Sequence, residues 1–184
     1  MWKLRACTWL GLAVALALPS CHTAPKPEVA VGESQQQISE SLKKLYMACS
    51  AAPAHSPQQQ KLVLDMANQA SNGKELLLVM RAGVGVFSPG QESEKRVRSI
   101  VASKMIKVAT LDQLIELATL YSVNPEDARP FAQRIFELAG EDSNPRVWYR
   151  IKLAANHLEL RDLEHQAQAK GDQLSHGKTS PNNN

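Results

Sequence analysis

The chain has 184 residues, of which 21 are lysine or arginine and 18 are aspartate or glutamate, so its formal net charge is +3. So small a charge excludes a strongly basic nucleic-acid binder and an acidic tail protein. Aromatic residues form 5% of the chain, which argues against a base-stacking surface, and three cysteines are too few for a disulfide scaffold.

The N-terminal segment has the charge pattern of an export signal. Lys3 and Arg5 precede an uncharged run over residues 6–18. This run is shorter than the roughly 20 apolar residues that cross a bilayer, and it ends in Leu18-Pro19-Ser20-Cys21. These four residues resemble the lipobox of bacterial lipoproteins, in which proline is not the usual residue at the second position. The resemblance covers only the signal segment.

The resemblance implies that residues 1–20 are removed and that the thiol and the freed amine of Cys21 are acylated. Stable anchoring needs more than one acyl chain, and each buried methylene contributes about 0.8 kcal/mol. His22 follows the cysteine where aspartate would favour the inner membrane, so the resemblance implies an outer-membrane protein facing the periplasm. Exposure at the cell surface stays open. An ordinary secretory signal cut near Ala24 and an uncleaved anchor are the alternatives.

Composition divides the remaining chain into three parts. Residues 21–33 carry prolines and no apolar periodicity, which predicts a flexible tether. Residues 34–170 carry apolar residues at helical spacing, and they form the expected domain. Residues 171–184 are polar and are expected to be unstructured.

Start and stop signals divide the domain into six or seven helices. Ser56-Pro57, Thr110 with Gln113, Asn124-Pro125 and Asn144-Pro145 are typical of helix starts, and the last of these is expected to open one helix to about Lys170. No segment alternates as a strand would. The sequence therefore predicts an all-α fold, either an irregular helical bundle or a short α-solenoid of helical hairpins.

The segment from Lys74 to Phe87 is the most apolar part of the domain and predicts a buried central helix. Gly83 and Gly85 either end that helix or allow close packing. Arg81 is the only charge within the apolar run from Leu76 to Phe87. Three roles are open for this residue. Its aliphatic carbons can cover apolar neighbours while the guanidinium reaches water, or the guanidinium can pair with a buried carboxylate, or it can bind a carboxylate of a partner.

Signatures of catalysis and metal binding are absent from the sequence pattern. The histidines are scattered, no Gly-x-Ser-x-Gly turn occurs, and Gly83-Val84-Gly85 lacks the third glycine of a phosphate loop. We therefore expect no metal site, no cofactor and no enzyme. Cys49 is expected to be a buried, inert thiol on a helix, or to form an intermolecular disulfide.

A membrane anchor without catalytic signatures favours a protein that binds another envelope protein. In general plan the chain resembles pilotins and other helical lipoproteins, which implies an accessory of a secretion, pilus or conjugation machine. We expect a groove between helices to receive an amphipathic segment, with Arg81, Phe87, Trp148 and Tyr149 as contacts. The alternatives are a self-associating structural or exclusion lipoprotein, and a cell-envelope enzyme or inhibitor. No nucleic-acid partner is expected.

Overall fold

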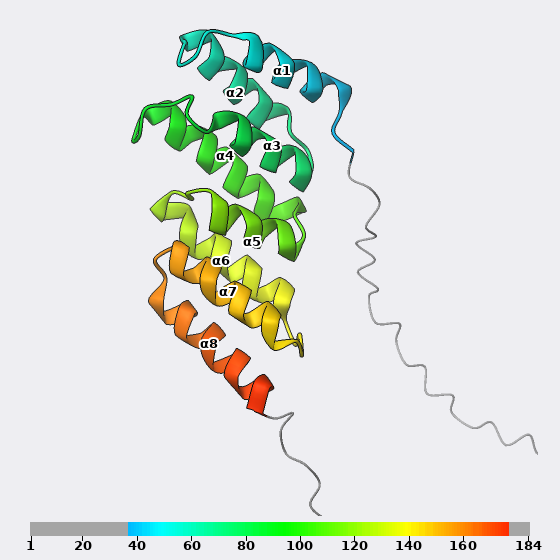
Figure 1. The fold of residues 1–184 in the computed structure, drawn as a ribbon, viewed down its shortest axis with the longest axis vertical. Coiled ribbons are helices and arrows are strands. Elements are labelled where there is room, and N and C mark those ends of the chain that lie inside the picture. Colours follow the sequence, from blue (N-terminus) through cyan, green and yellow to red (C-terminus); the bar gives the residue numbers. More distant parts are fainter. Residues whose placement is uncertain (1–36, 177–184) are drawn as a thin grey trace, which may run out of the picture. The chain divides into compact units, whose positions relative to one another are not determined.

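A computed structural model describes residues 37–176 and confirms the all-α fold class. These residues form helices and no strand (Figure 1). The eight helices are α1 (Glu40–Ala51), α2 (Pro57–Gln69), α3 (Gly73–Gly83), α4 (Glu92–Val108), α5 (Leu111–Leu120), α6 (Pro125–Ala139), α7 (Pro145–His157) and α8 (Arg161–His176). The predicted signal peptide, Cys21 and the predicted tether lie outside the described residues.

The helices pack as successive hairpins within residues 37–176. Helices α1 and α2, α3 and α4, α5 and α6, and α7 and α8 pair with one another, and each hairpin packs on the next. Helices α1, α3, α5 and α7 follow one another in one layer, and α2, α4 and α6 follow one another in a second. Of the two architectures that the sequence left open, this serial packing is that of a short α-solenoid.

The helix starts follow the predicted caps in three cases and differ in a fourth. The Ser56 hydroxyl accepts a hydrogen bond from the Gln59 amide at 3.1 Å, Thr110 and Gln113 form a capping box, and Asn144 accepts from the Arg146 amide. Asn124 stands at the N-cap of α6, but its side chain is buried and makes no cap. Its amide donates to the Lys95 carbonyl at 2.8 Å, which joins α6 to α4.

A buried carboxylate fixes the start of α1 to the first turn of α3. The side chain of Glu75 is 1% exposed and accepts hydrogen bonds from the Ser39 amide at 2.8 Å and the Ser71 amide at 2.8 Å. The Ser71 hydroxyl donates to the same carboxylate. Burial works to raise the pKa of Glu75, and these hydrogen bonds more than reverse it, so the pKa lies below its ordinary value.

The prediction of one long helix from Asn144 to Lys170 is wrong, because the chain turns back after His157. Glu159 adopts a left-handed conformation with φ of 59°. Its amide donates to the Asn156 carbonyl, and the Leu160 amide donates to the Ala155 carbonyl, each at 3.0 Å. This is a Schellman turn, which usually has glycine or asparagine at the left-handed position. The glutamate there hides the turn from sequence patterns.

The predicted unstructured tail also begins too early, because α8 continues to His176. Gly171 is buried there rather than ending the helix. A Cβ atom at this position would lie 3.1 Å from Cε1 of Tyr149, so the glycine allows α8 to approach α7 closely. Residues 177–184 lie outside the part of the chain that the structure describes.

Candidate functional site

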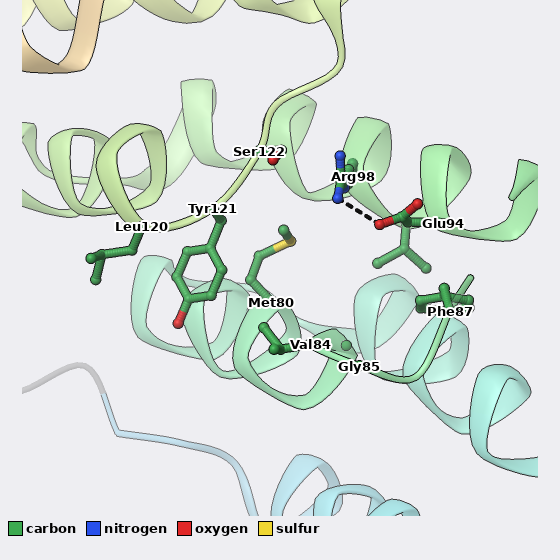
Figure 2. A pocket seen from close by; sticks show the side chains of 11 residues that line it. Met80, Val84, Gly85, Phe87, Glu94, Arg98, Leu120, Tyr121 and Ser122 are labelled. Carbon is green, nitrogen blue, oxygen red and sulfur yellow. Dashed lines mark hydrogen bonds and ion pairs between the residues drawn. The ribbon is translucent and has the colours of Figure 1, made fainter. Parts of the chain in front are cut away.

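The end of α3, the start of α4 and the end of α5 enclose a pocket of about 230 Å³ (Figure 2). Most of its lining residues are apolar, although polar atoms form about half of its exposed wall, and it opens between the C-terminal ends of two neighbouring helices of one layer. The lining residues are Met80, Gly83, Val84, Gly85, Phe87, Glu94, Val97, Arg98, Leu120, Tyr121 and Ser122.

A tight turn after α3 builds one wall of this pocket. The chain leaves the helix at Val84, and Gly85 has a positive φ of 75°. The Val86 amide donates to the Gly83 carbonyl, and the turn sends Val86 and Phe87 back into the core. Val84 is left 69% exposed at the mouth of the pocket.

An ion pair supplies the charged groups of the pocket. Nη2 of Arg98 donates to Oε1 of Glu94 at 2.5 Å, and Oε2 of Glu94 accepts from the Gly90 amide at 2.9 Å. Glu94 and Arg98 stand one turn apart on α4, with the glutamate on the N-terminal side, which is the favourable order. The two charges cancel and no other lining residue is charged, so the pocket carries no net charge and presents apolar side chains beside polar atoms.

Exposed leucines extend the apolar surface from the end of α5 to one further helix, α7. Leu120 at the end of α5 is 67% exposed, and Leu153 on α7 is 51% exposed. A second hollow of about 330 Å³ lies between α5 and α7 and has Leu120 and Leu153 in its lining. Since Leu120 also lines the first pocket, Val84, Leu120 and Leu153 form one series over α3, α5 and α7. We call these three residues the apolar row.

Two of the four contact residues expected from the sequence lie near this row. Phe87 lines the pocket. Arg81 is exposed on α3, three residues before Val84, and it makes no ion pair or hydrogen bond within residues 37–176 that would hold its head in place. Of the three roles expected for Arg81, pairing with a buried carboxylate is not seen among residues 37–176, whereas its exposure agrees with a head that reaches water and leaves binding to a partner open.

Trp148 lies away from the row, in the core between α6, α7 and α8. Its side chain is 4% exposed, and its indole nitrogen donates to the Asp142 carbonyl at 2.8 Å. The ring meets Phe136 edge to face at 5.8 Å between centroids, and the Lys170 ammonium lies 6.0 Å from its centre. These partners make Trp148 a packing residue of the last hairpin.

Tyr149 fastens α8 to α7. Its hydroxyl donates to Oδ1 of Asp172 at 2.8 Å, and its ring lies against Gly171. Hydrogen bonds from Gln168, and then from Tyr149, hold the pKa of Asp172 below its ordinary value. The structure thus separates the four expected contacts into two groups, and only Arg81 and Phe87 belong with the apolar row.

Cys49 is buried on α1, and burial raises the pKa of its thiol. A buried thiol with a raised pKa is a poor nucleophile and is not presented to another chain. Within residues 37–176, no group of three histidine, cysteine, aspartate or glutamate side chains could hold a metal ion. None of the helices in that range has the length and hydropathy needed to cross a bilayer.

The sequence interpretation missed Leu120 and Leu153. Each falls off the buried stripe of its own helix, between residues that do face the core. A large apolar residue off the stripe is the signal that would have found them, although a single exposed leucine is common on protein surfaces. What distinguishes these two is that the stacking of α5 on α7 brings them to one hollow.

No protein-family model matches the chain, and no curated protein or solved structure is significantly similar to it.

Proposed function

We propose that this chain is a lipid-anchored binding protein of the bacterial outer membrane that holds an amphipathic helix of an envelope protein on its apolar row. The observation that carries the proposal is the continuity of the row. Val84, Leu120 and Leu153 are each more than half exposed, and the pockets beside them are joined through Leu120. Connected apolar surface of this kind is typical of sites where proteins bind.

The shape of the row suits a helix laid in a groove. The pocket of about 230 Å³ can take one apolar side chain, and the hollow of about 330 Å³ can take a second. Full burial of a leucine or valine side chain contributes about 1.5–3 kcal/mol, so covering the exposed parts of three such residues supplies a useful part of a binding free energy. Stacked hairpins provide a rigid support for such a surface.

The membrane part of the proposal rests on the sequence alone, through the resemblance of Leu18-Pro19-Ser20-Cys21 to a lipobox. An acylated Cys21 would keep the helical domain at the envelope, where a secretion, pilus or conjugation machine supplies partners. Labelling of cells with radioactive palmitate tests this part directly. The wild-type chain should take up label, Cys21→Ala should not, and label on Cys21→Ala would contradict the proposed anchor.

Site-specific photo-crosslinking tests the binding surface in the full-length protein in cells. A photoreactive residue is placed at Val84, at Leu120, or at the exposed control position His165 on α8. We expect one discrete adduct with the same envelope protein from the first two positions and none from the control. Adding Leu120→Asp to the chain with the probe at position 84 should remove that adduct.

Two results would overturn the proposal. Equal labelling from all three positions, or from none, would show that the row is not a specific binding surface. A crosslink between two copies of this chain through Val84 and Leu120 would instead establish the self-associating alternative.

A further inference from the structure

A cation precedes the exposed apolar residue by three positions on three helices of one layer. Both members of each pair are exposed. The pairs are Lys44 with Met47 on α1, Arg81 with Val84 at the end of α3, and Arg150 with Leu153 on α7. Residues three apart on a helix lie on the same face. Arg81 and Arg150 therefore flank the apolar row on the side toward the N-terminal ends of their helices, and Lys44 stands in the same relation to Met47, outside the row.

The fifth helix breaks this pattern with acidic residues. Leu120 on α5 is preceded by Glu116 and Asp112 rather than by a cation. Asp112 pairs with Arg150 of α7 at 2.6 Å between Oδ1 and Nη1. Arg81 has no such partner among residues 37–176. The positive charge beside the row is thus partly neutralised over α5 and α7 and remains unopposed at Arg81.

We propose that the occupant of the apolar row is an acidic amphipathic helix, with a carboxylate beside Arg81. This inference rests on the proposed function and specifies the chemistry of the partner. Packed helices have axes about 8–10 Å apart, and seven residues of a helix span about 10.5 Å. A helix crossing α3, α5 and α7 therefore meets Val84, Leu120 and Leu153 with apolar residues about seven positions apart.

The charges also define where acidic residues of the partner are favourable. A carboxylate toward α3 faces Arg81, whereas a carboxylate in the middle of the segment approaches Glu116 and Asp112 of α5. The partner should therefore concentrate its acidic residues at the end that crosses α3. Its middle should carry neutral or basic residues on that flank. Complementary charges of this kind set orientation and partner choice more than they set affinity.

Two designed peptides test the inference with the purified full-length protein in detergent. Both are amphipathic helices with leucines about seven positions apart, and they carry either glutamate or lysine on the flank that would face Arg81. We expect the glutamate peptide to bind roughly tenfold more tightly in fluorescence anisotropy, with a difference that shrinks as salt is added. Arg81→Glu should abolish that preference.

Two further variants separate this inference from the proposed function. Arg96→Glu reverses an exposed cation on α4, in the other layer, and should leave the preference unchanged. Leu120→Asp should weaken the binding of both peptides, because it places a charge in the apolar row. If Leu120→Asp weakens both peptides while the two bind equally and Arg81→Glu changes nothing, the charge assignment is overturned and the proposed binding surface stands.

Other results overturn both claims together. Failure of both peptides to bind would remove the apolar row as a helix site. Binding of phosphatidylglycerol vesicles that is lost in Arg81→Glu, without peptide binding, would assign the cations to a lipid surface instead.

Discussion

The pocket at the ends of α3 and α5 and the contact between α7 and α8 both contain large apolar side chains, but these side chains have different surroundings. The polar atoms of Trp148 and Tyr149 have hydrogen-bond partners. The indole ring of Trp148 is buried and meets Phe136, and the ring of Tyr149, which is 38% exposed, packs on Gly171. Val84 and Leu120 are both more than half exposed, and they line a pocket. Residue type alone favours the aromatic pair as an interface anchor, whereas the geometry favours the aliphatic residues. A side chain that already has all its partners has little left to offer another molecule.

The largest test of this comparison is Trp148→Ala. Removing a buried indole leaves a cavity and an unpartnered carbonyl at Asp142, so we expect a loss of about 3–5 kcal/mol in the free energy of unfolding. Urea unfolding followed by circular dichroism measures this loss. Trp148→Phe keeps an aromatic ring and should lose less. A loss below about 1 kcal/mol for Trp148→Ala would contradict a structural role.

Gly171→Val tests the close approach of α8 to α7. A side chain at this position would meet the ring of Tyr149, so we expect a loss of about 1–3 kcal/mol and faster hydrogen exchange in α8. Ala169→Val is the matched control, because it places the same side chain on an exposed position of the same helix. Similar effects of the two substitutions would show that valine disturbs the helix itself rather than its contact with α7.

Individual helix starts, turns and contacts show which features could be predicted from the sequence and which could not. Helix starts at Ser56, Thr110 and Asn144 were predictable, because their hydrogen bonds are local in the chain. The turn at Glu159 and the packing of Gly171 were not, because the first uses an unusual residue and the second depends on a ring 22 positions away. The same limit explains the candidate site, since Phe87 lay in a recognisable apolar run and Leu120 acquired its neighbours only through stacking.

Glu75 extends the comparison to the two ends of α3. The polar groups of its first turn have partners, whereas Val84, just after its last residue, is exposed to solvent. Glu75→Gln replaces one accepting oxygen with a donor that faces an amide or a hydroxyl, and we expect a loss of about 1–3 kcal/mol at neutral pH. The pKa of Glu75 is lowered on folding, so its contribution is present above the pKa of the unfolded chain and is lost as pH falls through the folded pKa.

Unfolding measured across a pH series checks the sign of this effect. The wild type should be more stable than Glu75→Gln at neutral pH, and the two should converge below the ordinary value of 4.5. Glu92→Gln, at an exposed position in the first turn of α4, removes only a surface charge near the helix N-terminus and should stay within about 0.5 kcal/mol of the wild type across the series. A gap between the wild type and Glu75→Gln that persists in acid would mean that the carboxylate charge is not what stabilises this contact.

Leu120→Ser should change the free energy of unfolding least of all these variants. It can therefore test binding without disturbing the fold. Leu120 is 67% exposed, so folding removes little of its side chain from water, and the substitution should change the free energy of unfolding by less than about 0.5 kcal/mol. Leu117→Ser on the same helix removes a fully buried leucine and should cost several times more, about 3–5 kcal/mol. A loss above about 1 kcal/mol for Leu120→Ser would make Leu120 a packing residue like Trp148. If the free energy of unfolding is unchanged while the crosslink from Val84 disappears, Leu120 contributes to binding a partner rather than to the stability of this chain.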